Sequence, residues 1–317
     1  MKKSLIALAV LAAAGTASAQ SSVTIYGKVD LGLNQAIGSD VTKLGEASGS
    51  RFGLTGAEDL GGGLKANFKL EHRFQPDTGA VTKPDVFWHG TSTVGLSGGF
   101  GSVDLGRTYS AAFYTASAGD VFGWDGVASN ASTTNAGTQA TRFSNGIFYT
   151  SPNLNGFTAR VSYGLKDDGD NYNSGTKEVG AATKNGTSVE LAYANGPVRV
   201  SVAAERNVNE NEYVGVGGSY DFGVAKANLL IARGEKASEP GVDRDAVVLG
   251  LVVPMGALTL KASYAQLEVG NTETIKQLGL GARYALSKRT DLYTSVANNS
   301  KAASDKTGYE FGIQHNF

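Results

Sequence analysis

Charged side chains stand at every second position in several stretches of the sequence, and this spacing limits the chemistry that they can do. In LKANFKLEHRF (64–74), charged residues alternate with apolar ones: Lys65, Lys69, Glu71 and Arg73. A strand places alternate residues on one face, so these charges would form a row along a single strand. Such a row acts on ions by attraction and repulsion, whereas covalent catalysis requires a nucleophile held next to a base.

The same alternation assigns further charges to one polar face. It is clear in VTIYGKVDLGL (23–33), FTARVSYGL (157–165), PVRVSVAAE (197–205) and ALTLKASYA (257–265). The basic residues at polar positions are Lys28, Arg51, Lys65, Lys69, Arg73, Arg160, Arg199, Lys226, Lys261 and Arg283. The acidic residues there are Asp30, Glu71, Asp104, Glu190 and Glu205. Basic residues therefore outnumber acidic ones on this face, although the whole chain has a formal charge of −1.

The elements that must carry these charges are strands, because period-two alternation runs along the chain and helical periodicity is nearly absent. Sixteen candidate strands cover 23–33, 51–57, 64–74, 87–96, 102–109, 143–150, 157–165, 187–194, 198–205, 213–220, 224–233, 246–253, 257–267, 275–284, 291–297 and 308–317. Their connections alternate between tight turns, such as 195–196, and longer polar loops, such as 110–142. This pattern predicts an all-β, up-and-down antiparallel barrel.

Alternation alone also fits a soluble exported sandwich whose polar face contacts water. The turn lengths favour a barrel in a membrane instead. Lipid cannot satisfy the edges of a spanning sheet, so the sheet must close, and about sixteen strands enclose an aqueous channel. The apolar parity would then face lipid and the charged parity would face water, which explains a hydrophobic content of only 41%.

Both ends of the sequence carry signals that fit this interpretation. Residues 1–19 have a basic start, an apolar run and small residues at Ala17-Ser18-Ala19, which predicts a secretory signal peptide and leaves 20–317 as the barrel. The chain has no cysteine. The last segment, GYEFGIQHNF (308–317), is half apolar and is expected to pair with 23–33, which would place Phe317 at the rim.

Several longer motifs carry a resemblance to a known family. They are SSVTIYG (21–27), SRFGLTGAEDLGGGLKANFKLE (50–71), VGLSGGFGSVDLGR (94–107), FYTSPNLNGF (148–157), YALSKRTDLY (284–293) and HNF (315–317). Over essentially all of 20–317 the chain resembles the Gram-negative trimeric general porins, in the branch typical of beta-proteobacteria. The resemblance implies a transmembrane 16-stranded antiparallel β-barrel of the outer membrane, assembled as a homotrimer, with a long inward-folded third loop at 110–142. It also implies that the barrel-assembly machinery recognises Phe317.

The resemblance further implies which charges lie at the narrowest part of the pore. Arg51 and Glu71 match family positions where a basic cluster on the wall faces an acid near the constriction. The other residues expected at the constriction or in the lumen are Lys69, Arg73, Arg107, Asp120, Asp125 and Arg142. Many relatives carry an arginine near position 90, where this chain has Gly90 beside His89, so one wall charge is expected to be missing. His89 would add charge only below about pH 6.5.

These features predict a channel for the passive diffusion of ions and small hydrophilic solutes, with a modest preference for anions. The alternative is a substrate-selective channel in which Tyr109, Tyr114 and Trp124 form a track for a sugar or an aromatic acid. Lipopolysaccharide and outer-membrane lipids are the other expected partners.

The sequence predicts neither an enzyme nor a bound cofactor. Its histidines, 72, 89 and 315, lie far apart and lack metal-ligand spacing. A barrel-type hydrolase would need a Ser–His pair facing lipid near the rim, and of the histidines only His72 and His315 have that parity. An isoelectric point of about 6.3 gives no sign of nucleic-acid binding.

Overall fold

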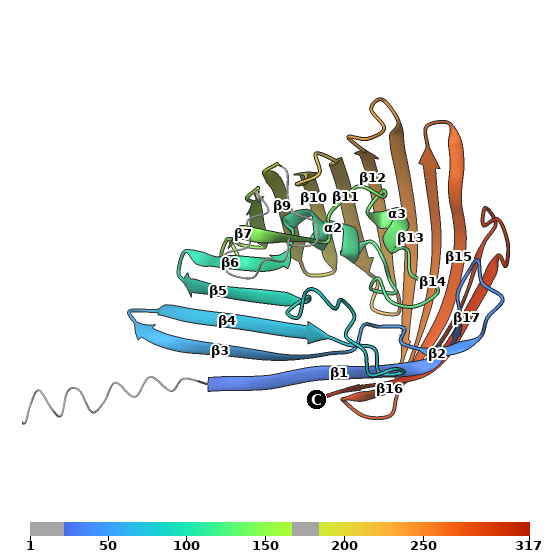
Figure 1. Ribbon diagram of the computed structural model, residues 1–317, viewed down its shortest axis with the longest axis horizontal. Coiled ribbons are helices and arrows are strands. Elements are labelled where there is room, and N and C mark those ends of the chain that lie inside the picture. The colour runs from blue at the N-terminus through green and yellow to red at the C-terminus, as the bar shows by residue number, and fades with distance from the viewer. Residues whose placement is uncertain (1–21, 167–183) are drawn as a thin grey trace, which may run out of the picture.

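The computed structural model describes residues 22–166 and 184–317, and the expected signal peptide, 1–19, lies outside them. In these residues seventeen strands form one antiparallel sheet, which closes because β1 (Ser22–Gln35) pairs with β17 (Thr307–Asn316) (Figure 1). One of the strands, β2 (Lys43–Gly45), has three residues and lies against the end of β1. Sixteen strands therefore make up the barrel wall, as predicted.

The other wall strands follow one another around the barrel in sequence order. They are β3 (Arg51–Gly61), β4 (Leu64–Arg73), β5 (Thr91–Gly98), β6 (Gly101–Tyr109), β7 (Arg142–Thr150), β8 (Phe157–Gly164), β9 (Gly186–Asn195), β10 (Val198–Arg206), β11 (Glu212–Asp221), β12 (Lys226–Glu235), β13 (Asp243–Met255), β14 (Leu258–Val269), β15 (Thr272–Ala285) and β16 (Thr290–Asn299). A tilted strand needs about 9–11 residues to span a bilayer, and most of these strands reach that length.

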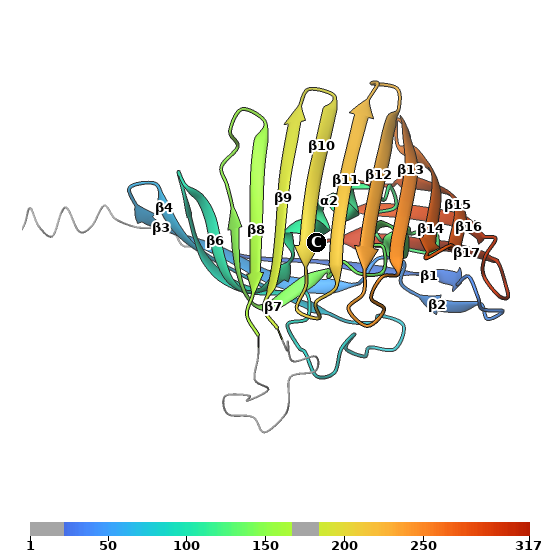
Figure 2. The ribbon, with the colours of Figure 1, turned by 90° about the horizontal axis from the view of Figure 1, so that it is seen from above.

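Connections of different length gather at opposite ends of the barrel. At the short-turn end, the strands are joined by 62–63, 99–100, 151–156, 196–197, 222–225, 256–257 and 286–289. The opposite, long-loop end carries 36–50, 74–90 and 110–141, although its connection 270–271 is also tight. Figure 2 shows this arrangement along β8 to β13, with the short hairpins at one edge of the wall. The tight turns depend on glycine where the backbone is left-handed, as at Gly196 with φ +52.

The bounds of most predicted strands differ from those in the structure by one to four residues, and in one strand the difference replaces strand by turn. The alternation predicted a strand over 87–96, whereas β5 begins at Thr91 and ends at Gly98. Residues 87–90 form a turn instead, because the carbonyls of His89 and Gly90 accept hydrogen bonds from arginine side chains. The alternating pattern in FWHG therefore does not reflect a sheet ladder.

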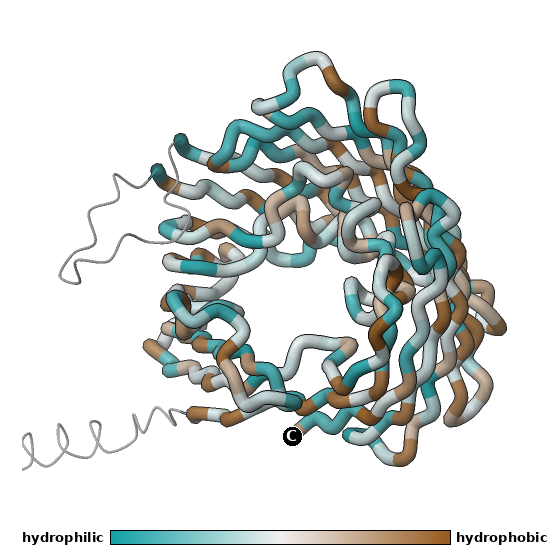
Figure 3. Tube along the Cα trace, turned by 45° about the vertical axis from the view of Figure 1, so that its right-hand side comes forward, coloured by the Kyte–Doolittle hydropathy of each residue, from teal (hydrophilic) through white to brown (hydrophobic). Residues whose placement is uncertain are grey.

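Apolar and polar parities face opposite sides of the wall, as predicted. In β11, Val214 and Val216 are 52% and 55% exposed, whereas Tyr213 is 1% exposed. Apolar and hydrophilic residues accordingly alternate along the strands (Figure 3). No helix in the described ranges is long and apolar enough to cross a membrane. The exposed apolar residues of the strands form the outer surface of the barrel, and the opposite parity faces its interior.

The C-terminal residue extends the pairing between β17 and β1 that closes the barrel. The backbone N–H of Gly27 donates to Phe317 O, and the Phe317 N–H donates to Gly27 O, both at 3.0 Å. A Cβ at position 27 would overlap the Phe317 ring, so the glycine makes room for the aromatic side chain. The predicted closure between the last strand and the first is thus confirmed.

Candidate functional site

The segment 110–141 packs against the inner face of the wall. It contains α2 (Ala111–Ala118) and α3 (Ala131–Thr134), which lie within the ring of strands (Figure 1). The N–H of Ala112 donates to Ser188 Oγ at 2.8 Å, and Asn228 Nδ2 donates to the Ala118 carbonyl at 2.9 Å. Ser188 and Asn228 both have the inward parity, so α2 runs along the interior of the barrel.

Asp120 joins distant parts of the segment through hydrogen bonds. Its buried carboxylate accepts the backbone N–H groups of Phe122 at 2.9 Å, Trp124 at 3.0 Å and Asn130 at 2.9 Å, together with the Asn130 side chain at 3.2 Å. Burial raises the pKa of Asp120 above its ordinary value, and these donors act in the opposite direction. Asp120 therefore points into the loop itself, and not into the lumen.

Carboxylates on the wall hold the same segment from outside. Glu205 Oε1 accepts the Ala140 N–H at 2.5 Å, and Glu310 Oε2 accepts the Val127 N–H at 3.1 Å. Glu310 was missing from the residues inferred from sequence, although its polar parity in 308–317 was a sufficient signal. These contacts attach the segment to β10 and β17 at separate points along its length.

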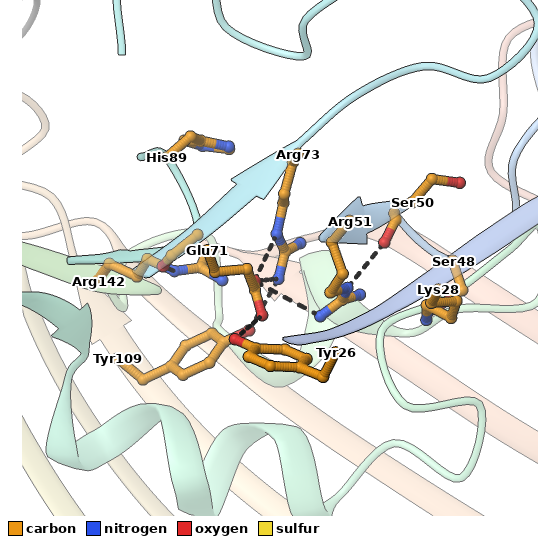
Figure 4. Close-up of polar contacts among 12 residues, drawn as sticks. Tyr26, Lys28, Ser48, Ser50, Arg51, Glu71, Arg73, His89, Tyr109 and Arg142 are labelled. Atoms are coloured by element: carbon orange, nitrogen blue, oxygen red, sulfur yellow. Dashed lines mark hydrogen bonds and ion pairs between the residues drawn. The ribbon is translucent and has the colours of Figure 1, made fainter. Parts of the chain in front are cut away.

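Arg51 and Arg73 converge on Glu71 on the inner wall near the long-loop end (Figure 4). Glu71 Oε1 lies 3.1 Å from Arg73 Nη2 and 3.8 Å from Arg51 Nη1. Tyr26 donates its hydroxyl to Glu71 Oε2 at 3.2 Å. The three charged residues occupy facing positions on β3 and β4, because Arg51 pairs with Arg73 and Gly53 pairs with Glu71.

Arg107 and Arg142 extend this group around the wall. Arg107 Nε donates to the His89 carbonyl at 3.1 Å, and Arg142 Nε donates to the Gly90 carbonyl at 2.7 Å. A Cβ at position 90 would overlap the Glu71 carboxylate, so a larger residue there would displace Glu71. Guanidinium groups from β6 and β7 thus lie beside the position where relatives were expected to carry an arginine.

Arg51, Arg73, Arg107 and Arg142, with the Glu71 carboxylate, are called the arginine cluster below. Four guanidinium groups with one carboxylate give the cluster a positive charge of its own. Lys69 lies next to it, with Nζ 5.2 Å from the centroid of the Tyr26 ring.

Asp125 lies apart from the arginine cluster, at the tip of the inward segment. Its Oδ2 accepts the hydroxyl of Ser48 at 2.6 Å, and Ser48 also contacts Lys28 Nζ. Of the predicted site residues, the structure thus brings Arg51, Lys69, Glu71, Arg73, Arg107 and Arg142 together. It places Asp120 and Asp125 on the loop.

The aromatic residues expected to form a solute track pack on one another. Tyr109 and Phe113 stack with centroids 4.0 Å apart, and Trp124 meets Phe113 edge-on at 4.9 Å. Arg142 lies 4.0 Å over the Tyr109 ring, and Arg160 lies 4.2 Å over the Tyr114 ring. These ring faces are occupied by other side chains, and they hold two guanidinium groups in place.

The surroundings of His89 oppose its protonation in the expected pH range. Burial, with Lys83, Arg107 and Arg142 nearby, lowers its pKa to about 4. We expect His89→Gln to have the same ion selectivity as the natural protein from about pH 7 to about pH 5, because the imidazole stays neutral there. Zero-current potentials in a KCl gradient at each pH measure this. An anion preference that rises on acidification in the natural protein, but not in His89→Gln, would contradict the lowered pKa.

The other histidines serve structural contacts. His72 has the outward parity but is buried, because Phe87 stacks on it at 4.1 Å and its Nδ1 lies 2.6 Å from the Phe87 carbonyl. In the described part of the chain, no group of three histidine or acidic residues is arranged to hold a metal ion.

Comparisons with known proteins agree with this architecture. A model of the Gram-negative porin family matches residues 5–304. The chain is 34% identical over 361 residues to outer membrane porin protein 32 of Delftia acidovorans, and 30% identical over 386 residues to an outer membrane porin protein of Bordetella pertussis, with both members of each pair covered completely. The structure of the anion-selective porin from Comamonas acidovorans superposes with a TM-score of 0.79 at 30% identity, covering 94% of this chain and 100% of that one. The chain therefore belongs to the Gram-negative porin family.

Proposed function

We propose that this outer-membrane barrel is a diffusion channel for ions and small hydrophilic solutes, and that the arginine cluster makes it prefer anions. The observation that carries the proposal is the gathering of Arg51, Arg73 and Arg142 around Glu71 and Tyr109 at the level of the inward segment, with Arg107 beside them. The positive charge is fixed by hydrogen bonds to Glu71, Tyr109 and backbone carbonyls, so it stays in place when an ion passes.

The mechanism is electrostatic. Fixed charges beside a narrow water-filled path in low-dielectric walls raise the local concentration of ions of opposite sign. The segment 110–141 would narrow the path opposite the arginine cluster, with Lys69 and Asp125 as further charges along it. The description of the Comamonas acidovorans structure as an anion-selective porin supports the same sign of selectivity.

Recording in planar lipid bilayers tests this proposal directly. Purified protein should form long-lived conducting pores, and the zero-current potential in a KCl gradient should report a chloride permeability above that of potassium. A clear cation preference would contradict the role given to the arginine cluster, while an absence of pores would contradict the channel itself.

Family membership also supports three partners. We propose a homotrimer, contacts with lipopolysaccharide around the long-loop end, and recognition of Phe317 by the barrel-assembly machinery. The terminal ring lies at the short-turn end and is 45% exposed, which leaves it available for recognition.

Phe317→Ala tests the last of these partners. We expect it to lower the amount of folded barrel in the outer membrane several-fold, because the aromatic signal is lost while both backbone hydrogen bonds to Gly27 remain available. Heat-modifiable electrophoretic mobility of membrane fractions measures this. Tyr309→Ala removes another outward aromatic ring from β17 and is the matched control. Equal losses in both variants would argue against a special role for the terminal residue.

A further inference from the structure

A cavity of about 190 Å³ lies in the inner wall under the C-terminal end of α2. It is lined by polar and small residues of β10, β11 and β12, among them Arg199, Ser201, Gly217, Ser219, Lys226 and Asn228. A water molecule needs about 10–15 Å³ on this measure, so the cavity can admit a solute of several non-hydrogen atoms. No residue of the arginine cluster lines it.

The cavity lies closer to the short-turn end of the wall than the arginine cluster does. Arg199, Ser219 and Lys226 are within three residues of the turns 196–197 and 222–225, at the short-turn end. The arginine cluster occupies the ends of strands next to the long loops. An ion that has passed the arginine cluster from the long-loop end would therefore meet the cavity afterwards.

Arg199 is only partly neutralised. Glu190 receives two guanidinium groups, one from Arg160 in close contact and one from Arg199 at 3.6 Å. The second distance exceeds that of an ordinary hydrogen bond, and the Arg199 side chain is 35% exposed. Its planar set of N–H donors is therefore available to a second anion.

Lys226 adds a second positive charge. Within residues 22–166 and 184–317, no carboxylate lies within ion-pair distance of its ammonium group. Asp221 faces Lys226 in the β11–β12 ladder, but its Oδ1 accepts the Gly223 N–H at 2.8 Å within the hairpin. The nearest acid is thus engaged by its own turn.

Neutral groups complete the cavity. The hydroxyls of Ser201 and Ser219 line it, and Gly217 leaves its floor without a side chain. The C-terminal end of a helix carries partial negative charge, which disfavours an anion. Here Asn228 donates to the Ala118 carbonyl, so one of these carbonyl groups is satisfied by a side chain.

We infer that this cavity is a binding subsite for small oxyanions, such as phosphate or a solute that carries a phosphate or carboxylate group. Arginine offers paired N–H donors to two oxygens of one oxyanion, and lysine adds a point charge to a third. Chloride has no such set of oxygens and would pass without specific binding. The inference rests on the proposed channel function only for the route by which the solute arrives.

Inorganic phosphate added at the short-turn side of single channels in KCl is the test. We expect phosphate to reduce the chloride current along a saturating curve, and acetate to act in the same way at higher concentration. Glycerol 3-phosphate distinguishes a phosphate group on a larger solute from free phosphate. Arg199→Gln and Lys226→Gln should each raise the half-blocking phosphate concentration about fivefold, and both together should raise it by more than tenfold.

Gly217→Ala tests the shape of the cavity without changing charge. The added methyl group would lie 3.4 Å from Leu230, 3.5 Å from Thr115 and 3.6 Å from Ser201, which are ordinary contacts, so the variant should fold and bind phosphate more weakly. Phosphate titration calorimetry in detergent gives a readout that does not depend on conduction. Arg51→Gln should change ion selectivity but not phosphate affinity.

The outcomes separate the two proposals. Anion-conducting pores whose phosphate block is absent, or is the same in all variants, would overturn the subsite and leave the channel function standing. Phosphate binding by calorimetry that depends on Arg199 and Lys226 would support the subsite even if the pores showed no anion preference.

Discussion

Replacing Arg51 and Arg73 together by glutamine is expected to lower the chloride-to-potassium permeability ratio about tenfold. Each unit charge several ångströms from a permeating ion contributes roughly 0.5–1 kcal/mol in a water-filled path, and about 1.4 kcal/mol corresponds to a factor of ten. Loss of both guanidinium groups also leaves the Glu71 carboxylate without its two ion-pair partners. The zero-current potential in a KCl gradient measures the change, and the effect should grow at low ionic strength.

Two further variants make this result specific. Glu71→Gln should shift the ratio in the opposite direction, since it removes the one negative charge of the arginine cluster. Arg233→Gln is the matched control, because Arg233 has the outward parity and its ion pair with Asp245 at 2.7 Å is exposed. A double arginine variant with unchanged selectivity, or Arg233→Gln with an equal shift, would show that the arginine cluster does not set the ion preference.

Asp120→Ala is expected to loosen the inward segment without unfolding the barrel. The carboxylate accepts three backbone N–H groups in a buried position, so its removal should destabilise the local fold of the loop by about 3 kcal/mol or more. The strand ladders make none of these contacts and should persist. We expect greater noise in the open-channel current and faster hydrogen exchange at Phe122, Trp124 and Asn130.

Asp120→Asn should have a smaller effect, because the amide keeps one acceptor oxygen. Asp221→Ala is the control for loss of a carboxylate that holds a backbone N–H, since Asp221 lies in a hairpin away from the segment. Quiet single-channel currents and unchanged exchange in Asp120→Ala would show that wall contacts, such as those of Glu205 and Glu310, are sufficient to fix the loop.

The barrel was predictable from sequence because lipid outside and water inside select apolar and polar residues at alternate positions of each strand. Lys65, Lys69, Glu71 and Arg73 could be assigned to the inner face because lipid excludes their charges from the outer one. The same rule explains the success with the closing strand, 308–317, whose apolar parity pairs with that of β1. Period-two alternation thus carries most of the information about strands and their faces.

The alternation was a poorer guide at positions whose contacts lie outside the strand ladders. It predicted a strand at 87–90, but there the His89 and Gly90 carbonyls bind Arg107 and Arg142. The buried position of Asp120 depends on how the loop folds back on itself, and the lowered pKa of His89 depends on neighbours distant in sequence. Such contacts form only when the closed barrel brings the loops together, so no local sequence pattern predicts them.

Single cysteines placed on the two faces of the wall test the central claim most directly, because the chain has none of its own. Lys69→Cys and Arg199→Cys should react with a water-soluble, membrane-impermeant thiol reagent in the folded protein in lipid vesicles. Val202→Cys and Val216→Cys should be labelled only by a reagent confined to the bilayer, since both side chains lie on the exposed apolar parity. Labelling of position 69 or 199 from the lipid, or of 202 or 216 from water, would contradict a barrel that is apolar outside and charged within.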